Sequence, residues 1–518
     1  MGKSSAASKP KGEFILSLDA GTGSVRGLLF DLEGNRAGTE IRPRGYLPDP
    51  CGQPFLYVFD PRDFWGIVCD GIRSLLRNAG TGPESILAVS SSCQRFSYLF
   101  LDGEGEVLYA GPNLDPRGVF TQTDIETRLG TAYYRLTGQW PPLLSGLSKI
   151  LWFRQEAPQT FDRIRTAFML GDWMSYKLSG ERTAEITAAS GSGFLELAAP
   201  KWSEEILGAF HLDRDLFPPL IFPGQVIGGV SSRAAGETGL KAGTPVVAGG
   251  ADTQCALLGA GLWGPGQFGI AAGTTAPVCL WMDSPLVDPE ERLWSSWHLS
   301  PSSWILEANG QWSGRVYQWL HDFFANAGVR AGPDGDIYRW MEEEAARLPP
   351  GAHDTLACLG PILMDARQFH TVRPGLFLFP PPAHLMTESP AMPGHLIRAA
   401  LENIAFSMRG NIERASRVGA VRPDRLYLTG GLARSRLFCR ILADCTGLPV
   451  QAGRESEGSA LGAAVCAAAG VKAFPDLATA QKALVHLDRI SEPSAADTEL
   501  YQPVYERWCE VYAKIEEI

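Results

Sequence analysis

One pattern occurs twice in the sequence, once near its start and once just past its middle. Residues 14–30, FILSLDAGTGSVRGLLF, form an apolar run, a Gly-Thr turn and a second apolar run. Residues 268–281, FGIAAGTTAPVCLW, have the same order of features. A repeat with so long a period predicts two similar domains that face each other. Two unrelated hairpins could share this order of features by coincidence. The repeat alone therefore does not decide between two similar domains and two unrelated hairpins.

Helix and strand signals alternate along the rest of the chain. Asp60-Pro61 is typical of a helix N-cap followed by proline at the first helical position, and apolar residues then recur with helical spacing. Residues 86–92, ILAVSSS, predict a buried strand. Further helices are expected at 395–418 and 435–445, and a further strand at 425–431. This alternation predicts a layered α/β fold.

Composition excludes several classes of protein. The chain of 518 residues is long enough for two to four domains of roughly 100–200 residues each. Its net charge is −11 and no basic stripe stands out, which argues against nucleic acid as a partner. None of the ten cysteines forms a C-x-x-C pair, and no H-E-x-x-H occurs. This pattern predicts free thiols in a reducing compartment and no structural metal site.

The ends of the chain predict no membrane attachment. Residues 1–12 lack the apolar segment of a secretory signal, so we expect a flexible N-terminal tail. The apolar run at 461–471, LGAAVCAAAGV, is too short to span a bilayer. We therefore expect a cytoplasmic protein without a membrane partner.

A carboxylate at a strand tip precedes the first Gly-Thr turn. Asp19 ends the apolar run, and Gly21, Thr22, Gly23 and Ser24 follow. Glycines let a backbone approach a polyanion closely, and a carboxylate beside such a turn can hold a magnesium ion that keeps several waters. The alternative is an ordinary glycine-rich hairpin with an exposed aspartate. The chain contains no Walker A motif, so this is not a P-loop.

The second half offers three comparable features. Asp252 follows the buried run PVVAGG, where it could accept a proton from a hydroxyl group or simply cap the next helix. Gly273, Thr274 and Thr275 form the second Gly-Thr turn and could contact a terminal phosphate. The Gly430-Gly431 pair ends another predicted strand and could let an adenosine lie against the backbone.

Taken together, these motifs resemble the FGGY family of carbohydrate kinases over about residues 13–515. Within the family the sequence is most similar to autoinducer-2 kinases, with xylulokinases and glycerol kinases as neighbouring alternatives. The resemblance implies two actin-like, ribonuclease-H-like domains with a cleft between them: 13–248 on the substrate and magnesium side and 249–518 on the nucleotide side. The segments that carry it are LDAGTGSVRGLLFD, NLDPRG (113–118), GDWMSYKLSG (171–180), GLKAGTPVVAGGADTQ (239–254), GTTA (273–276), LYLTGG (426–431), ILADCTGLPV (441–450) and SALGAA (459–464).

The resemblance also implies residue roles, with ATP and Mg²⁺ as cofactors and a small sugar or polyol as substrate. Asp252 would be the catalytic base, and Asp19 would organise the magnesium ion. The nucleotide would contact Thr22, Gly23, Ser24, Gly273, Thr274, Thr275, Gly430, Gly431 and Ser435. The substrate would contact Gln94, Arg95, Phe96, Asp115, Asp252, Thr253 and Gln254.

Three departures from the family pattern stand out. Phe96 stands where glycerol kinases and autoinducer-2 kinases place a glutamate, and xylulokinases carry Gln-Met-His where this chain has Gln-Arg-Phe, so we expect a partly apolar substrate floor and the substrate stays open. Leu432 replaces a usual glycine at the nucleotide strand, which bears on the adenosine contacts. An actin-like or chaperone-like ATPase with protein partners is the alternative from another class, and the substrate-like segments NLDPRG and QRF count against it. The sequence leaves the oligomeric state open, a homodimer included.

Overall fold

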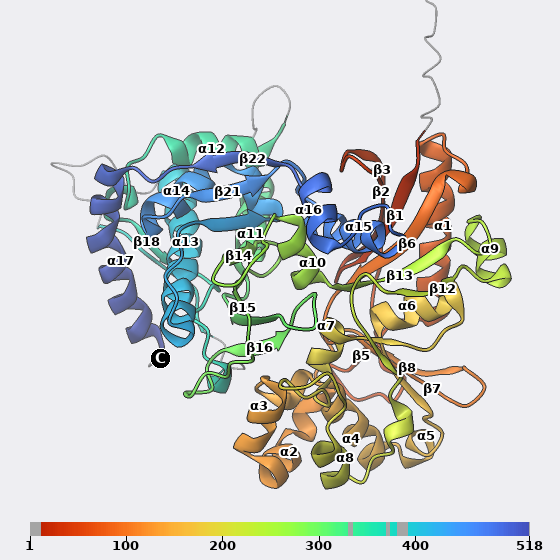
Figure 1. Ribbon diagram of the computed structural model, residues 1–518. Coiled ribbons are helices and arrows are strands. Elements are labelled where there is room, and N and C mark those ends of the chain that lie inside the picture. The colour runs from red at the N-terminus through yellow and green to blue at the C-terminus, as the bar shows by residue number, and fades with distance from the viewer. Residues whose placement is uncertain (1–11, 330–334, 369–372, 381–391, 517–518) are drawn as a thin grey trace, which may run out of the picture.

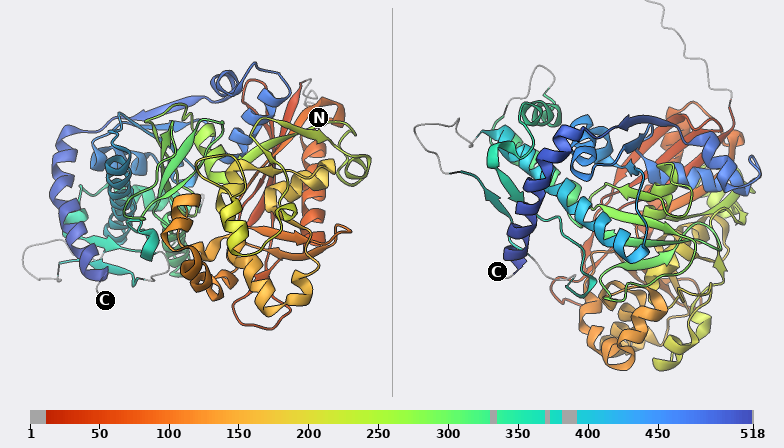
Figure 2. Two further views of the ribbon diagram at one scale, coloured as in Figure 1. Left: turned by 60° about the horizontal axis from the view of Figure 1, so that its bottom comes forward. Right: turned by 60° about the vertical axis from the view of Figure 1, so that its left-hand side comes forward.

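The computed structural model describes residues 12–329, 335–368, 373–380 and 392–516. Nearly all of the predicted N-terminal tail lies outside these residues. The first half of the chain, red to yellow in Figure 1, lies beside the second half, green to blue. Each half contains one large sheet with helices around it, as the two turned views in Figure 2 also show. The predicted α/β class is confirmed.

The two large sheets repeat one topology. In the first sheet the hairpin β1–β2 is antiparallel, β6 adds in parallel beside β1, β13 adds in parallel beside β6, and β3 adds antiparallel beside β2. In the second sheet β14–β15, β20, β21 and β17 take the corresponding places. The predicted internal repeat is therefore confirmed. The strands are β1 Phe14–Ala20, β2 Ser24–Asp31, β3 Arg36–Pro43, β6 Ile86–Cys93, β12 Val226–Gly229, β13 Pro245–Ala251, β14 Phe268–Ala271, β15 Pro277–Met282, β16 Trp294–Trp297, β17 Trp304–Asn309, β20 Leu426–Thr429, β21 Val450–Gly453 and β22 Leu487–Ser491.

The longer helices begin and end close to their predicted positions. Asp60 caps α1, because its carboxylate accepts the Arg62 and Asp63 backbone N–H groups at 2.7 and 3.1 Å. The expected helices at 395–418 and 435–445 are α13 and α14. The main helices are α1 Pro61–Asn78, α6 Leu170–Ser179, α9 Ser232–Thr238, α10 Asp252–Gly259, α11 Ser313–Asn326, α12 Ile337–Ala346, α13 Pro393–Gly419, α14 Arg436–Thr446, α15 Gly458–Gly470, α16 Leu477–Leu484 and α17 Ala495–Glu516.

Short elements extend the first half below its large sheet in Figure 1. The strands β7 Tyr98–Leu101, β8 Val107–Gly111 and β9 Thr166–Met169 form a three-stranded sheet there. The helices of this region are α2 Gln122–Leu129, α3 Thr131–Thr137, α4 Gly146–Glu156, α5 Pro158–Phe161, α7 Ile186–Ala189 and α8 Glu204–Ala209. The remaining short strands pair as β4 Leu47–Pro48 with β5 Tyr57–Val58, β10 Ala184–Glu185 with β11 Leu220–Ile221, and β18 Leu356–Cys358 with β19 Leu376–Leu378.

Two helices cross between the halves. The helix α10 follows β13 of the first sheet but contacts β14 and β20 of the second, whereas α15 follows β21 of the second sheet and contacts β1, β6 and β13 of the first. The two helices also pack on each other at the centre of the molecule (Figure 1). Glycine makes this crossing close, since a Cβ atom on Gly462 would lie 2.0 Å from the Cys255 carbonyl oxygen. The crossing therefore fixes the start of α10 against the start of α15.

Replacing Gly462 with Ala is expected to destabilise the protein. The added methyl group would meet backbone, which can move little, and overpacking of this kind costs about 1–3 kcal/mol in the free energy of unfolding. Gly236→Ala in α9 is the matched control, because its Cβ atom would meet nothing within 4 Å and alanine favours a helix by about 1 kcal/mol. Urea unfolding measures both changes. Equal stability of the two variants would contradict the packing argument.

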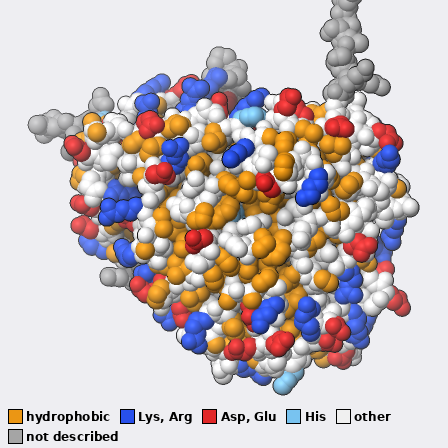
Figure 3. Space-filling view, in the orientation of Figure 1, with side chains coloured by type: hydrophobic (Ala, Val, Ile, Leu, Met, Phe, Trp, Pro, Cys, Tyr) orange, Lys and Arg blue, Asp and Glu red, His pale blue; other side chains and the backbone are white. Residues whose placement is uncertain are grey.

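On the face drawn in Figure 3, acidic and basic side chains are interspersed and hydrophobic side chains gather across the middle. Among the described residues, no helix has both the length and the apolar character needed to cross a bilayer.

Candidate active site

Three neighbouring strands of the first sheet end at one edge and bring the predicted residues together. Ala20 of β1 and Ala251 of β13 both pair with Cys93 at the end of β6. Asp19, Gln94 and Asp252 each lie within one residue of these positions. The carboxyl ends of parallel strands are the usual place for ligand sites in α/β sheets. The two carboxylates, far apart in the sequence, therefore lie at the same edge of the sheet, close enough for the charge of Asp252 to act on Asp19.

Asp19 is a buried carboxylate whose pKa lies near neutral pH. Its residue is 6% exposed, and burial raises its pKa from 3.8 to about 7. The Arg26 guanidinium, with Nη1 at 3.6 Å from Oδ2, acts in the opposite direction, while the negative charges of Asp252 and Glu457 add to the rise. A bound cation would relieve this unfavourable burial of negative charge.

Asp252 is the first residue of α10. Its Oδ1 accepts the backbone N–H of Thr253 at 2.8 Å, and the N-cap position belongs to Ala251, so the alternative that Asp252 caps the helix is wrong. Burial raises the pKa of the Asp252 carboxyl group, and the Arg95 guanidinium is the main influence that lowers it. The Ser459 hydroxyl of α15 donates to the Asp252 backbone carbonyl at 3.1 Å, which ties this residue to the helix crossing.

Arg95 connects the two halves through a paired carboxylate. Its guanidinium forms a bidentate ion pair with Glu307 of β17, at 2.7 and 2.8 Å. The Glu307 side chain is 1% exposed and also accepts the Asn309 side-chain N–H at 3.0 Å. Sequence reasoning missed Glu307. Its signal was one charged residue within the otherwise apolar run WILEA.

Two buried amide side chains have atoms without a hydrogen-bond partner among the described residues. The Gln94 side chain is buried, and neither its nitrogen nor its oxygen has a hydrogen-bond partner among the described residues. The Gln254 Nε2 reaches Ser296 and the Trp297 carbonyl at 3.3 Å, but its Oε1 has no partner in this part of the chain. Unsatisfied buried polar atoms cost about 1–3 kcal/mol each, so these amides indicate a place for a polar ligand.

Aromatic rings line the side of Arg95. Phe96 has a positive φ of 62° and packs edge-on against Trp294, with ring centroids 5.8 Å apart. The Arg95 guanidinium lies 5.6 Å from the Phe96 ring centroid and 5.8 Å from that of Trp294. The predicted partly apolar floor is thus present as a pair of rings beside the ion pair.

Asp115 lies in a different environment from the other predicted substrate residues. Its carboxylate accepts from Tyr109 and pairs with Arg117, and its backbone carbonyl accepts from Lys149 at 2.9 Å. All of these groups are buried, which favours a structural role. In the same segment, Asn113 donates to the Thr22 hydroxyl at 3.2 Å and so reaches the first Gly-Thr turn. The substrate contact of Asp115 stays a prediction.

The predicted nucleotide residues lie on three turns. Ala271 pairs with Thr429, so the turn Gly273–Thr275 lies next to Gly430. Gly430 has φ +94°, and a Cβ atom there would lie 2.4 Å from the Ala272 carbonyl oxygen, so this position requires glycine. Cβ atoms on Gly23 and Gly431 would meet nothing within 4 Å, which leaves open space for a ligand beside the backbone.

Ser435 and Glu457 lie at the starts of two helices near these turns. The Ser435 hydroxyl accepts the Phe438 N–H at 3.0 Å and donates to Glu342 at 2.9 Å, so it holds the start of α14, and its nucleotide contact stays a prediction. Glu457, which sequence reasoning missed, precedes α15 and pairs with Arg26 at 2.7 Å.

These residues suit a magnesium ion that is held by few carboxylates together with waters and nucleotide phosphates. Among the described residues, no group of three or more His, Cys, Asp and Glu side chains could hold a metal ion. Mg²⁺ needs no such cage, because it commonly binds one or two carboxylates, waters and the phosphates of a nucleotide. The buried charge of Asp19 suits this mode of binding.

Comparison with known proteins bears on the site as a whole. The models of the N-terminal and C-terminal domains of the FGGY family of carbohydrate kinases match residues 14–259 and 269–471. The autoinducer-2 kinase of Salmonella paratyphi A is 31% identical over 507 residues, 97% of this chain and 94% of that protein. The autoinducer-2 kinase of Escherichia coli K12 is 32% identical over 511 residues, 96% and 94% of the two chains.

Solved structures share the fold over nearly the whole chain. The xylulose kinase of Rhodospirillum rubrum has a TM-score of 0.83 at 25% identity and covers 98% of this chain and 99% of its own. The glycerol kinase of Plasmodium falciparum, solved with ADP, has a TM-score of 0.81 at 17% identity, with 97% and 98% covered, and supports the fold alone. The alternative of a chaperone-like ATPase is not supported. This chain belongs to the FGGY family of carbohydrate kinases and transfers a phosphoryl group from ATP to a sugar.

Proposed function

We propose that this kinase phosphorylates one hydroxyl group of a small sugar or polyol with Asp252 as general base, and that autoinducer-2 is its first candidate substrate. The observation that carries the proposal is the position of Asp252, half-buried at the strand ends beside Arg95 and near the Gln94 amide, which has no hydrogen-bond partner among the described residues. The names of the related kinases support autoinducer-2, with xylulose and glycerol as alternatives.

The chemical step needs little more than positioning and charge stabilisation. The substrate hydroxyl donates its proton to Asp252 as its oxygen attacks the γ-phosphorus, and ADP leaves on the opposite side. Arg95 favours the ionised carboxylate of Asp252, since its positive charge opposes the effect of burial on the pKa. Asp252 is thus a base whose pKa lies above that of a free aspartate and closer to the working pH.

The phosphate tail would lie between the two Gly-Thr turns. Backbone N–H groups around Gly23 and Gly273 and the hydroxyls of Thr22, Thr274 and Thr275 are the donors available there. A magnesium ion held through waters by Asp19 would neutralise charge on the phosphates. The adenosine would lie along Gly430 and Gly431, where the second glycine leaves open space.

The substrate pocket combines polar and apolar walls. The amides of Gln94 and Gln254 offer donors and acceptors to hydroxyl groups, while the rings of Phe96 and Trp294 suit a carbon face that lacks them. Arg95 is already paired with Glu307, so it adds little net charge to the pocket. These walls favour a compact, uncharged substrate.

A screen of ADP release tests the proposal. The enzyme is supplied with ATP, Mg²⁺ and one of autoinducer-2, xylulose, glycerol or no acceptor. We expect the highest kcat/KM with autoinducer-2 and one ADP released per phosphorylated product. Equal ADP release without any acceptor would contradict the proposed transfer, and a clear preference for xylulose or glycerol would replace the candidate substrate.

Asp19→Asn is expected to raise the magnesium concentration needed for half-maximal activity by about tenfold or more, because one charge-assisted contact to the hydrated ion is lost. Titration of activity with MgCl₂ at fixed ATP measures this change. Asp31→Asn is the matched control, since Asp31 ends β2 and its carboxylate binds the turn at Asn35. An unchanged magnesium requirement in Asp19→Asn would refute the metal assignment.

The pH dependence of kcat follows from the raised pKa of Asp252. Only the ionised carboxylate accepts a proton, so kcat falls as the pH decreases through this pKa. Because burial raises the pKa above 3.8, the fall begins at a higher pH than for a free aspartate. A profile of kcat between pH 4.5 and 8.5, with substrates saturating at each pH, measures this fall of kcat at low pH. A fall of kcat that begins no higher than expected for a free aspartate would contradict the assignment.

A further inference from the structure

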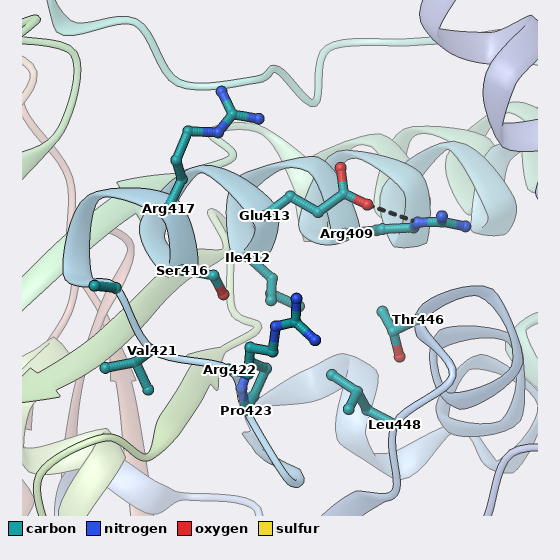
Figure 4. A pocket seen from close by; sticks show the side chains of 11 residues that line it. Arg409, Ile412, Glu413, Ser416, Arg417, Val421, Arg422, Pro423, Thr446 and Leu448 are labelled. Atoms are coloured by element: carbon teal, nitrogen blue, oxygen red, sulfur yellow. Dashed lines mark hydrogen bonds and ion pairs between the residues drawn. The ribbon is translucent and has the colours of Figure 1, made fainter.

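A separate pocket lies in the second half, at the edge of the sheet opposite the nucleotide turns. Its walls are the last turns of α13, the loop 420–423 that leads into β20, and the end of α14 (Figure 4). Its volume is about 620 Å³, within the usual range for small-molecule sites. Both β20 and α14 run from this pocket to the region of Gly430 and Ser435, so the two sites occupy opposite ends of the same elements.

The pocket carries a net positive charge on a protein whose net charge is −11. Three arginines and one glutamate line it. Arg409 pairs with Glu413 at 2.9 Å, donates to the Cys445 carbonyl at 2.9 Å and stacks over Tyr505 at 3.9 Å, so its charge is balanced and its position fixed. Arg417 and Arg422 form no ion pair or hydrogen bond with the described residues. Two positive charges therefore remain uncompensated.

The side chains facing the interior suit one anionic group. Figure 4 shows Arg422 pointing into the space between Ser416 and Thr446, whereas Arg417 extends away from it at the rim. The Ser416 hydroxyl oxygen is buried and has no hydrogen-bond partner in the described part of the chain. A guanidinium and an unpartnered hydroxyl on one side of a pocket are donors for a phosphate.

Apolar side chains complete the pocket. Ile412, Val421 and Leu448 line it beside the polar groups. A free inorganic ion would leave this surface uncovered, whereas a phosphate on a small carbon body would cover it. We propose that the pocket is a second binding site, separate from the catalytic cleft, for a small phosphate monoester whose phosphate lies against Arg422 and Ser416.

Calorimetric titration with glucose 6-phosphate tests the site. The enzyme is first saturated with MgADP, so that the phosphate positions of the cleft are occupied. Glucose and gluconate serve as probes with the same carbon skeleton and either no anionic group or a carboxylate. We expect saturable binding of glucose 6-phosphate and at least tenfold weaker binding of the other two. Equal binding of glucose or gluconate would overturn the assignment to phosphate.

Variants locate the binding. Arg422→Gln is expected to weaken glucose 6-phosphate binding at least tenfold, and Ser416→Ala to weaken it about threefold. Arg425→Gln removes the same charge from an exposed position nearby that does not line the pocket, and it should change the affinity less than twofold. All three variants should keep the wild-type kcat. No binding to the wild type, or unchanged affinity in Arg422→Gln, would overturn the proposal.

Discussion

Asp252→Asn is expected to lower kcat by about 10²–10⁴-fold, the usual contribution of a general base, while the affinity for ADP stays nearly constant. The asparagine has the same shape but cannot accept the proton of the substrate hydroxyl. Within the described part of the chain, the hydrogen bonds of the Asp252 side chain are those with Thr253. Nucleotide binding therefore has no direct dependence on its charge.

The measurements are steady-state kinetics, ADP titration and thermal unfolding of the same preparation. In the residual activity of Asp252→Asn, the part of the fall of kcat at low pH that comes from Asp252 should disappear, whereas any part that comes from Asp19 should remain. Ser459→Ala is the control, since it removes only a hydrogen bond to the backbone carbonyl of Asp252. A kcat within tenfold of wild type in Asp252→Asn would disprove the base assignment.

The second large effect is expected at the ion pair between Arg95 and Glu307. Glu307→Gln leaves a guanidinium whose side chain is only 10% exposed without its counter-charge. Breaking a buried pair in this way costs about 3–5 kcal/mol in the free energy of unfolding. The double variant Arg95→Leu/Glu307→Leu removes both charges and should recover most of this loss. Urea unfolding of the single and double variants measures the coupling.

Arg95 also has a catalytic consequence that a purely structural role would not produce. Its positive charge lowers the pKa of Asp252, so Arg95→Leu should move the fall of kcat to higher pH. The double variant should regain stability, although part of the pH shift should remain. A pH profile of Arg95→Leu that matches the wild type would show that the pair only holds the two halves together.

Local patterns in the sequence predicted much of the fold and part of the site. The hairpin with Asp19 at its tip, its repeat at Gly273 and the cap at Asp60 all depend on residues close together along the chain. Such features follow from strand alternation, glycine turns and capping chemistry, which act over a few residues. The same reasoning placed Asp252 at a strand end, although it could not decide between base and cap.

The tertiary structure decided which distant residues meet. Glu307 pairs with Arg95 across 212 residues of the chain, and Glu457 pairs with Arg26 across 431. Asp115 resembled a substrate residue by its segment, yet its carboxylate is enclosed by Tyr109 and Arg117. No periodicity encodes such pairs, because they depend on how packed elements are placed in space.

The sequence by itself thus determined two similar α/β halves, each with a Gly-Thr turn, and a carboxylate at the end of a buried strand. Only the tertiary structure decided that the helices after β13 and β21 cross and pack on the opposite sheets. That crossing depends on glycines that let two backbones approach, and it places Asp252 of α10 against Ser459 of α15. The strand ends determine where the site lies, and long-range packing determines which charges control it.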